Sequence, residues 1–324
     1  MRWSGCVARA GSVAALVGVA ALLVGTVGRL PAARAQGPEP AVFLCPMHPD
    51  VTARAPGTCP RCGMALVGGA VEPRDYAVEI EAAPRAPRAG QPVRLRFTVR
   101  HPSRSAVVRD FAIVHDKPYH FFVVSQDLEE YQHLHPQPQP DGSLLVDVTL
   151  GRPGYYRLYS DFLPLGGTPQ VVPGVLVTAD AGTDLASSRA RLVPDDVRRR
   201  VEGGMVATLE LPPTGLVAGR EEKLALHVHD AATGAPVTDL EPYLGAYGHA
   251  LVMSEDTLHY VHAHPIEQVV PGRVAAGGPD LTFKALLPKP GRYRIWAQVK
   301  RAGTVSTLPF TVEASSPAAL SGGR

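Results

Sequence analysis

The sequence predicts a mainly β protein, in which a small metal-stabilised knuckle precedes two tandem antiparallel β-sandwiches. Three observations predict this architecture: a short stretch rich in Cys, His and Pro, a long internal repeat, and alternation of apolar with polar residues inside that repeat. The chain has 32 Pro and 32 Gly, which suits many short strands joined by turns. Neither repeat contains a sustained helical period with capping residues.

Composition limits the classes of function. The chain has 324 residues, of which 45% are hydrophobic, and a formal net charge of +2. This hydrophobic content predicts folded domains rather than disorder, and the length predicts two or three of them. The near-neutral charge gives no electrostatic basis for binding nucleic acid, so no nucleic-acid partner is expected.

Residues 1–35 have the features of a secretory signal peptide. A positively charged start leads into an apolar run over 13–27, and a small-x-small cleavage site at 33–35 precedes Gln36. An uncleaved membrane anchor is the alternative, although an apolar run of about fifteen residues is shorter than the roughly 20 that span a bilayer. We therefore expect a mature protein from Gln36 that is periplasmic or secreted and has no membrane span after cleavage.

The predicted knuckle occupies residues 41–68. Two ligand pairs, Cys-x2-His and Cys-x2-Cys, are separated by ten residues, which is close to the spacing of a small four-ligand metal site. Gly63 allows the tight turn that points two sulfurs at one ion. Because so few apolar residues cannot form a core, the module is expected to need a metal ion or crosslinks to fold. The predicted metal-binding residues are Cys45, His48, Cys59 and Cys62, with Met47 and Met64 beside them.

This stretch resembles the short heavy-metal-binding domain found on copper-transporting P-type ATPases and on the periplasmic adaptors of copper and silver efflux pumps. The resemblance covers roughly residues 42–67 and implies metal binding. It does not imply transport, because nothing else in the chain resembles a pump. The matching positions are Cys45, Met47, His48, Pro49, Pro56, Gly57, Cys59, Cys62, Gly63 and Met64.

A disulfide is the alternative use of these cysteines. The fourth cysteine, Cys6, lies in the segment predicted to be removed, and the remaining odd number argues against a closed disulfide framework. A single Cys59–Cys62 bridge in an oxidising compartment stays open. The identity of the metal also stays open. Thiolate plus imidazole suits Zn(II), whereas the thioethers of Met47 and Met64 would favour a soft ion such as Cu(I) or Ag(I), unless they only pack over the knuckle.

The rest of the chain repeats itself. Residues 120–136 align without a gap with 249–265, at an offset of 129 residues. Alternation with period two marks strands such as 93–99 and 144–150, which predicts an antiparallel sandwich of roughly seven strands in each repeat. The predicted boundaries are 75–180 for the first sandwich, 181–203 for a linker, 204–315 for the second sandwich and 316–324 for a flexible tail.

Both repeats also resemble a set of bacterial secreted β-sandwich domains. The residues that carry this resemblance in the second copy read GHALVMSED, YVHAHP and PGRYRIWAQ. The resemblance implies an Ig-like or cupredoxin-like sandwich and an extracytoplasmic location, and such domains often accompany heavy-metal-binding modules. It implies no particular chemistry.

Each repeat contains a predicted hairpin whose histidines converge. In the first copy, residues 126–129 form the turn, so that His120 faces His135 across the two strands. Directly opposed residues share a face of the sheet, and His133 lies on that face too because it is two residues before His135. Three convergent imidazoles suit Cu(II) or Zn(II), although a slip of one residue would separate them. The predicted hairpin sites are His120, His133 and His135 in the first copy, and His249, His262 and His264 in the second.

A structural hydrogen-bond network and a catalytic role are the alternatives for these histidines. Outside the hairpins, four histidines of the repeats have no counterpart in the opposite copy, and we expect them to be surface or strand residues. These four are His101, His115, His227 and His229.

Three hypotheses for function follow. The first is a non-enzymatic, extracytoplasmic protein that captures or handles a heavy metal, with Cu(I) or Zn(II) as the ion and a periplasmic metal-efflux component as partner. The second is a secreted interaction protein whose knuckle is a zinc-stabilised docking surface. The third is a copper redox enzyme. A blue-copper site is excluded because the cysteines lie outside both sandwiches, and the sequence contains no phosphate loop or dinucleotide fingerprint.

Overall fold

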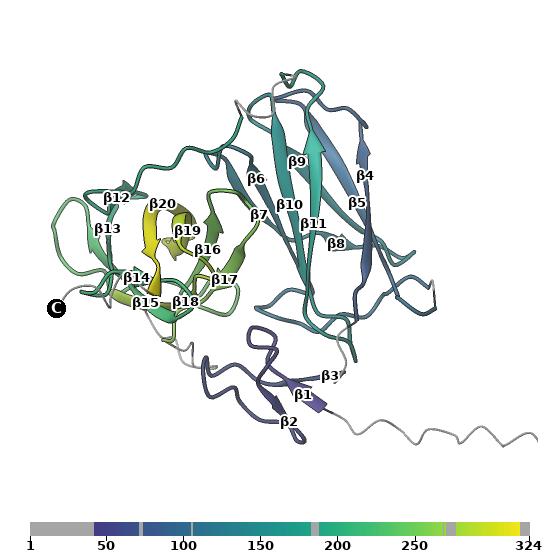
Figure 1. The fold of residues 1–324 in the computed structure, drawn as a ribbon, viewed down its shortest axis with the longest axis horizontal. Coiled ribbons are helices and arrows are strands. Elements are labelled where there is room, and N and C mark those ends of the chain that lie inside the picture. Colours follow the sequence, from purple (N-terminus) through teal and green to yellow (C-terminus); the bar gives the residue numbers. More distant parts are fainter. Residues whose placement is uncertain are drawn as a thin grey trace, which may run out of the picture. The chain divides into compact units, whose positions relative to one another are not determined.

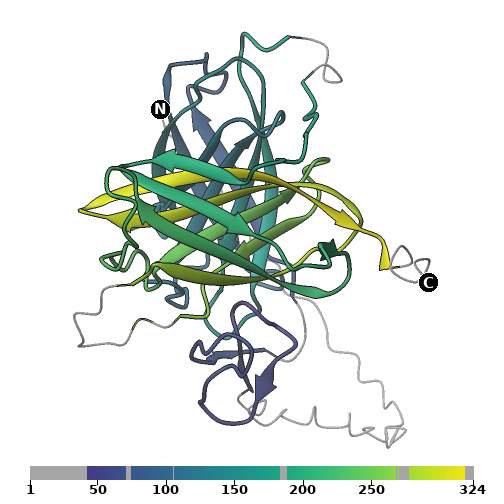
Figure 2. The ribbon, with the colours of Figure 1, turned by 90° about the vertical axis from the view of Figure 1, so that its left-hand side faces the viewer.

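In the computed structural model, every regular element of the described residues is a β-strand (Figure 1, Figure 2). The mainly β prediction is therefore confirmed. The structure describes residues 42–70, 74–104, 106–182, 188–267, 269 and 277–317. The predicted signal peptide, its cleavage site before Gln36, Cys6 and most of the predicted tail lie outside the described residues. Over the described ranges, we find no helix with the length and apolar character needed to cross a membrane.

The knuckle is a three-stranded sheet in the order β2-β1-β3. Its strands are short because Pro, Gly and ligand residues interrupt the chain between them. Cys45, Cys59 and Leu66 are buried in a small cluster inside it. Two of the predicted metal ligands thus also supply much of its interior. The strands are β1 (Val42–Leu44), β2 (Thr52–Ala53) and β3 (Val67–Gly69).

The knuckle is attached to the first repeat through a small apolar contact. Leu44 is buried in a cluster with Ala112 and Leu163 of that repeat. Next to this cluster, the N–H of Ala70 donates a hydrogen bond of 2.9 Å to the carbonyl of Gly167.

The first repeat is a sandwich of two four-stranded antiparallel sheets. One sheet has the order β4-β5-β9-β8 and the other β11-β10-β6-β7. Alternate residues of β5 are buried in the core between the sheets, which is the period-two pattern expected of a sandwich strand. The strands are β4 (Ala77–Ala83), β5 (Pro92–Arg100), β6 (Tyr119–Ser125), β7 (Tyr131–Leu134), β8 (Gln137–Pro138), β9 (Leu144–Thr149), β10 (Tyr155–Phe162) and β11 (Gln170–Val177).

The second repeat has the same plan, with β12 and β14 as additional strands and no counterpart of β8. Its sheets have the orders β12-β13-β15-β18 and β14-β20-β19-β16-β17. The β14–β20 pair is parallel, whereas the predicted sandwiches were antiparallel throughout. Strand β12 falls inside the range predicted as linker, so the sheet begins before residue 204. The strands are β12 (Arg199–Glu202), β13 (Met205–Glu210), β14 (Leu216–Val217), β15 (Glu221–Asp230), β16 (Gly248–Ser254), β17 (Tyr260–Ala263), β18 (Asp280–Leu286), β19 (Gly291–Arg301) and β20 (Thr304–Ser315).

Strands β6 and β16 are buried along their whole length, on both faces. In β6, Phe121 and Val123 lie in the core of the first sandwich, while Phe122 and Val124 belong to a different cluster. This second cluster joins the two repeats, because it also contains residues of β16 and β19. A strand buried on both faces needs a continuous apolar run, and both copies have one. The cluster consists of Phe122, Val124, Leu128, Tyr159, Ala190, Leu192, Leu251, Met253 and Trp296.

Candidate metal centres

The knuckle brings together the four ligands predicted from its spacing. One donor atom from each of Cys45, His48, Cys59 and Cys62 lies within 4.8 Å of the other three. The Sγ atoms of Cys45 and Cys62 are 3.6 Å apart, and His48 Nδ1 lies 3.6 Å from Cys59 Sγ. Sulfurs bound tetrahedrally to one ion at about 2.3 Å would be roughly 3.8 Å apart, so the donor set fits a metal ion. A disulfide would need the two sulfurs at about 2.05 Å.

A tight turn points two of the sulfurs inward. Gly63 has a φ of 74°, a conformation that favours glycine, and its N–H donates to the Cys59 carbonyl at 2.8 Å. The N–H of Cys59 donates in turn to the Met64 carbonyl at 2.7 Å. The expected role of Gly63 is thus confirmed.

The thiols of Cys45 and Cys62 share a proton. The hydrogen bond between them lowers the pKa of Cys45 and raises the pKa of Cys62. The pair therefore offers one thiolate more readily than an isolated thiol does, and the thiolate is the form that binds metals.

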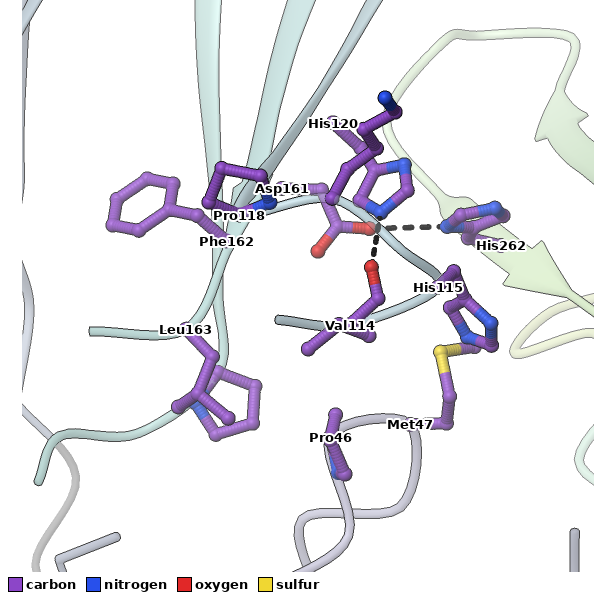
Figure 3. Close-up of a pocket in the computed structure, with 12 residues that line it drawn as sticks. Pro46, Met47, Val114, His115, Pro118, His120, Asp161, Phe162, Leu163 and His262 are labelled. Atoms are coloured by element: carbon purple, nitrogen blue, oxygen red, sulfur yellow. Dashed lines mark hydrogen bonds and ion pairs between the residues drawn. The ribbon is translucent and has the colours of Figure 1, made fainter. Parts of the chain in front are cut away.

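The two methionines lie beside this donor set rather than inside it. Met47 packs against the buried cysteine cluster. It also lies next to His115 and His262 in a small pocket between the knuckle and the repeats (Figure 3). A larger cavity of about 610 Å³ is lined by Met47 and Met64 from the knuckle and by His264 from the second repeat.

The first hairpin has the predicted register. Phe122 pairs with His133, and the N–H of Ser125 donates to the Glu130 carbonyl at 3.0 Å. His120 consequently lies opposite His135, and all three predicted histidines share one face. Their donor atoms lie within 4.8 Å of one another.

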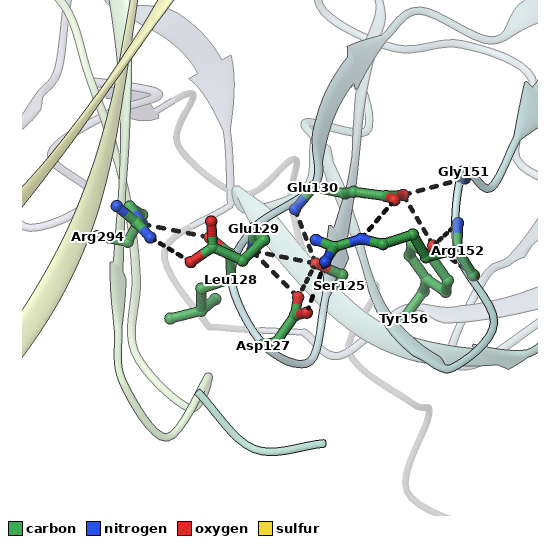
Figure 4. Close-up of polar contacts among 9 residues, drawn as sticks. All are labelled: Ser125, Asp127, Leu128, Glu129, Glu130, Gly151, Arg152, Tyr156 and Arg294. Carbon is green, nitrogen blue, oxygen red and sulfur yellow. Dashed lines mark hydrogen bonds and ion pairs between the residues drawn. The ribbon is translucent and has the colours of Figure 1, made fainter. Parts of the chain in front are cut away.

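The turn of this hairpin is held by side-chain hydrogen bonds (Figure 4). The Ser125 hydroxyl donates to Asp127 Oδ1 at 2.5 Å and accepts from the N–H of Glu130 at 2.8 Å. Leu128 has a φ of 61°, so the turn stays tight. Glu129 extends from the same turn to an ion pair of 2.6 Å with Arg294 of the second repeat.

The second hairpin repeats this geometry. Ala250 pairs with Ala263, which places His249 opposite His264. The Ser254 hydroxyl donates to Asp256 at 2.5 Å, as in the first copy. The second predicted set of donor atoms also lies within 4.8 Å.

Hydrogen bonds to backbone carbonyls fix the tautomer of the first histidine in each set. The Nε2 atom of His120 lies 2.9 Å from the Val114 carbonyl, as Figure 3 shows, and that of His249 lies 2.8 Å from the Tyr243 carbonyl. A carbonyl only accepts, so Nε2 carries the proton in both rings and Nδ1 keeps its lone pair. In both rings, Nδ1 is the atom that faces the other histidines.

The second histidine of each set has its outer partner in the opposite repeat. His133 Nδ1 lies 3.1 Å from the side-chain oxygen of Gln298 on β19. His262 Nδ1 lies 3.3 Å from Asp161 Oδ2 on β10 (Figure 3). These contacts leave both Nε2 atoms pointing toward the centres of their sets.

The structure places the two predicted hairpin sites next to each other. The rings of His120 and His262 have centroids 5.5 Å apart, and those of His133 and His249 are 5.8 Å apart. The interface between the repeats therefore brings both sets into one cluster.

The prediction that His115 is a surface or strand residue is wrong. His115 lies in a turn with a φ of 49°, and its ring stacks on His264 with centroids 3.5 Å apart. Its Nε2 is buried and has no hydrogen-bond partner among the described residues. The repeat gave no signal for it, because the residue at the same offset in the second copy is Leu244. His227 and His229 do lie in a strand, β15.

Burial keeps the clustered imidazoles neutral. Desolvation, together with a smaller effect of neighbouring His120, lowers the pKa of His135 and of His249 to about 3. Desolvation also lowers the pKa values of the other clustered histidines. Neutral imidazole is the form that binds metal ions.

Comparison with known families confirms the resemblance of the knuckle. Residues 42–68 match the family described as Heavy metal binding domain. The copper-transporting P-type ATPase of Rhizobium leguminosarum bv. viciae is 44% identical over 48 residues, which are 15% of this chain and 6% of the ATPase. The copper-exporting P-type ATPase of Legionella pneumophila subsp. pneumophila is 63% identical over 27 residues, 8% of this chain and 4% of that protein. The chain thus spans only a small part of the length of these relatives.

Solved structures resemble the chain only weakly. The Escherichia coli adhesin FdeC has a TM-score of 0.25 at 12% identity, covering 75% of this chain and 66% of the adhesin. A Salmonella alpha-2-macroglobulin has a TM-score of 0.23 at 12% identity, covering 77% of this chain and 15% of that one.

The two repeats match one family twice. Residues 71–180 and residues 199–316 each match the family described as Domain of unknown function (DUF8832). These matches cover more than half of the chain. The chain therefore belongs to the DUF8832 family, and it carries a heavy metal binding domain ahead of its two copies.

Proposed function

We propose that this protein captures copper, or a similar soft metal ion, outside the cytoplasm and binds it without catalysing a reaction. The observation that carries the proposal is the convergence of two buried cysteines, Cys62 and His48 on one point of the knuckle. The similarity of this module to copper ATPases supports copper as the ion. The signal-like features of residues 1–35 support the location. An efflux component is the partner that fits this setting.

The surroundings of the knuckle support an ion that is handed on. Met47 and Met64 place soft thioether donors on the cavity of about 610 Å³, and His264 lines the same cavity. An ion that leaves the cysteines toward this cavity meets imidazoles of the cluster. In our proposal the knuckle captures the ion and this cavity is its route of exit.

A second candidate function is a zinc-stabilised docking knuckle. The observation in its favour is the contact of Leu44 with Ala112 and Leu163, which ties the metal-dependent fold of the knuckle to the first repeat. In that case the ion would be structural. It would remain in a closed shell of four ligands and would not exchange.

Metal selectivity separates the two candidates. The mature chain from Gln36 would be purified under reducing conditions and titrated with Cu(I) and Zn(II) against competing chelators, beside Cys59→Ser and a His227→Gln control outside both metal centres. Capture predicts tight Cu(I) binding that Cys59→Ser abolishes and that a chelator can slowly remove. Zinc binding alone, with no Cu(I) competition, would refute the capture function and favour the docking knuckle.

A further inference from the structure

We propose that the interface between the two repeats holds a second metal centre, a paired site for two divalent cations of the Cu(II) or Zn(II) kind. Each histidine set supplies one half, and Asp161 makes the half in the second repeat the tighter one. This centre is distinct from the cysteine knuckle, so the proposal stands even if the knuckle binds only zinc.

The first argument is the spacing of nitrogen lone pairs. His120 Nδ1 lies 3.1 Å from His133 Nε2 and 3.3 Å from His135 Nε2. In the second copy, His249 Nδ1 lies 3.4 Å from His262 Nε2. Imidazole nitrogens bound tetrahedrally at about 2.0–2.1 Å from one ion would be roughly 3.3–3.4 Å apart. Each set thus has the dimensions of three ligands of one ion.

A hydrogen-bond network does not account for these distances. The outer partners of His120 and His133 hold the proton of each ring on the nitrogen that faces away from the set. The inner nitrogens then face each other at 3.1 Å with no proton between them. A cation between the nitrogens satisfies the lone pairs instead.

The second argument is that each repeat supplies the outer hydrogen-bond partner of a histidine in the other repeat. Asp161 pairs with His120 along the β10–β6 ladder, and Gln298 pairs with His249 along β19–β16, so the two occupy equivalent positions. Each reaches the second histidine of the opposite repeat. Outer partners of this kind orient a metal-binding imidazole and set its basicity. Neither half is complete without the other repeat.

The two outer partners, Asp161 and Gln298, differ in charge. A carboxylate faces His262, whereas a neutral amide faces His133. A carboxylate makes the imidazole a stronger donor and offsets part of the charge of a cation. The same half contains two buried nitrogens without a hydrogen-bond partner among the described residues, the Nε2 atoms of His264 and of His115 stacked on it. The first cation should therefore enter the second repeat's half.

The test is a titration with Zn(II), and with Cu(II), of the full mature chain carrying Cys59→Ser to disable the knuckle. We expect two ions per chain, with unequal affinities. Asp161→Asn should weaken the tighter site by about 10- to 100-fold and leave the weaker one unchanged. Gln298→Glu should tighten the weaker site. His227→Gln, outside the cluster, is the matched control and should change neither.

Other outcomes would overturn the proposal. Loss of all metal binding in the Cys59→Ser chain would mean that the ions bind at the knuckle, and it would refute the second centre. The capture function is tested independently, because it is refuted if the wild-type chain binds no Cu(I). One ion per chain would refute the paired site, and equal effects of Asp161→Asn on both ions would refute the ranking. Thermal melting checks that each variant is folded. With Cu(II), two adjacent ions should couple magnetically, so the EPR intensity should fall as the second ion binds.

Discussion

The neutral histidine cluster should make the metal-free protein sensitive to acid. The perturbation is a change from pH 7.5 to pH 5.5 with all metal removed. His135 and His249 have pKa values of about 3 in the folded chain, because burial opposes protonation, against 6.5 for an unburied imidazole. Lys117 and the neighbouring imidazoles oppose protonation of His135 further, while the carboxylate of Asp161 favours it at His120 and His115.

The sign and the magnitude follow from proton linkage. Below pH 6.5 the unfolded chain binds protons that the folded chain excludes. The free energy of unfolding therefore decreases as the pH is lowered from about 6.5 toward 3. Between pH 7.5 and pH 5.5, protonation of each of these two histidines in the unfolded chain lowers the free energy of unfolding by about 1.4 kcal/mol. Together they lower it by about 3 kcal/mol. The other clustered histidines have lowered pKa values as well and add to this loss.

The assay is urea unfolding at both pH values, followed by tryptophan fluorescence. In the chain from Gln36, Trp296 is the one tryptophan, and it lies in the cluster that joins the repeats. The double variant His135→Gln/His249→Gln should lose less stability on acidification than wild type. His227 provides a control of opposite sign. A hydrogen bond to Asp280 raises the pKa of His227, so its protonation favours the folded state in acid, and His227→Gln should not reduce the loss of stability on acidification. Equal free energies of unfolding at the two pH values would refute the reasoning.

Three substitutions test the structural supports of the two metal centres. Trp296→Ala removes a ring that is 2% exposed and stacks on Tyr131 at 4.9 Å, and should cost about 3–5 kcal/mol in urea unfolding; a cost below 1 kcal/mol would mean that the repeats do not depend on this contact. Ser125→Ala removes the three hydrogen bonds of the Ser125 hydroxyl in the first turn and should cost about 1–3 kcal/mol. It should also weaken metal binding at the first histidine set while Ser254→Ala spares it. Gly63→Ala forces a residue with a side chain to adopt a φ of 74°, at a cost of about 1–2 kcal/mol. Calorimetry should then show weaker metal binding at the knuckle, and an unchanged affinity would contradict the role of the turn.

The hairpins could be predicted from sequence because their geometry is local. The four-residue turn set the register of His120 against His135, and the second copy followed from the repeat. The four donors of the knuckle were equally local, since they fall within eighteen residues.

The joining of the two histidine sets could not be predicted in this way. It depends on how two sheets pack, and that packing buries Phe122 and Leu251 on faces that a single sandwich would leave open. The uninterrupted apolar runs of the two strands carried the signal, but a run of that length is also compatible with an ordinary core strand. His115 was missed because its role exists only in one copy, and Asp161 was missed because its partner is in the other repeat.

The cluster contains one carboxylate, Asp161, among seven imidazoles. One dication in this setting is half neutralised by that carboxylate, but a second dication finds only the neutral amide of Gln298. Two unit charges about 4 Å apart repel by roughly 4 kcal/mol at an effective dielectric constant of 20, and dications repel more strongly. A small anion from solution, such as hydroxide or chloride, would therefore have to enter with the second ion. Loading of the full centre should depend on the supply of that anion as much as on the concentration of metal.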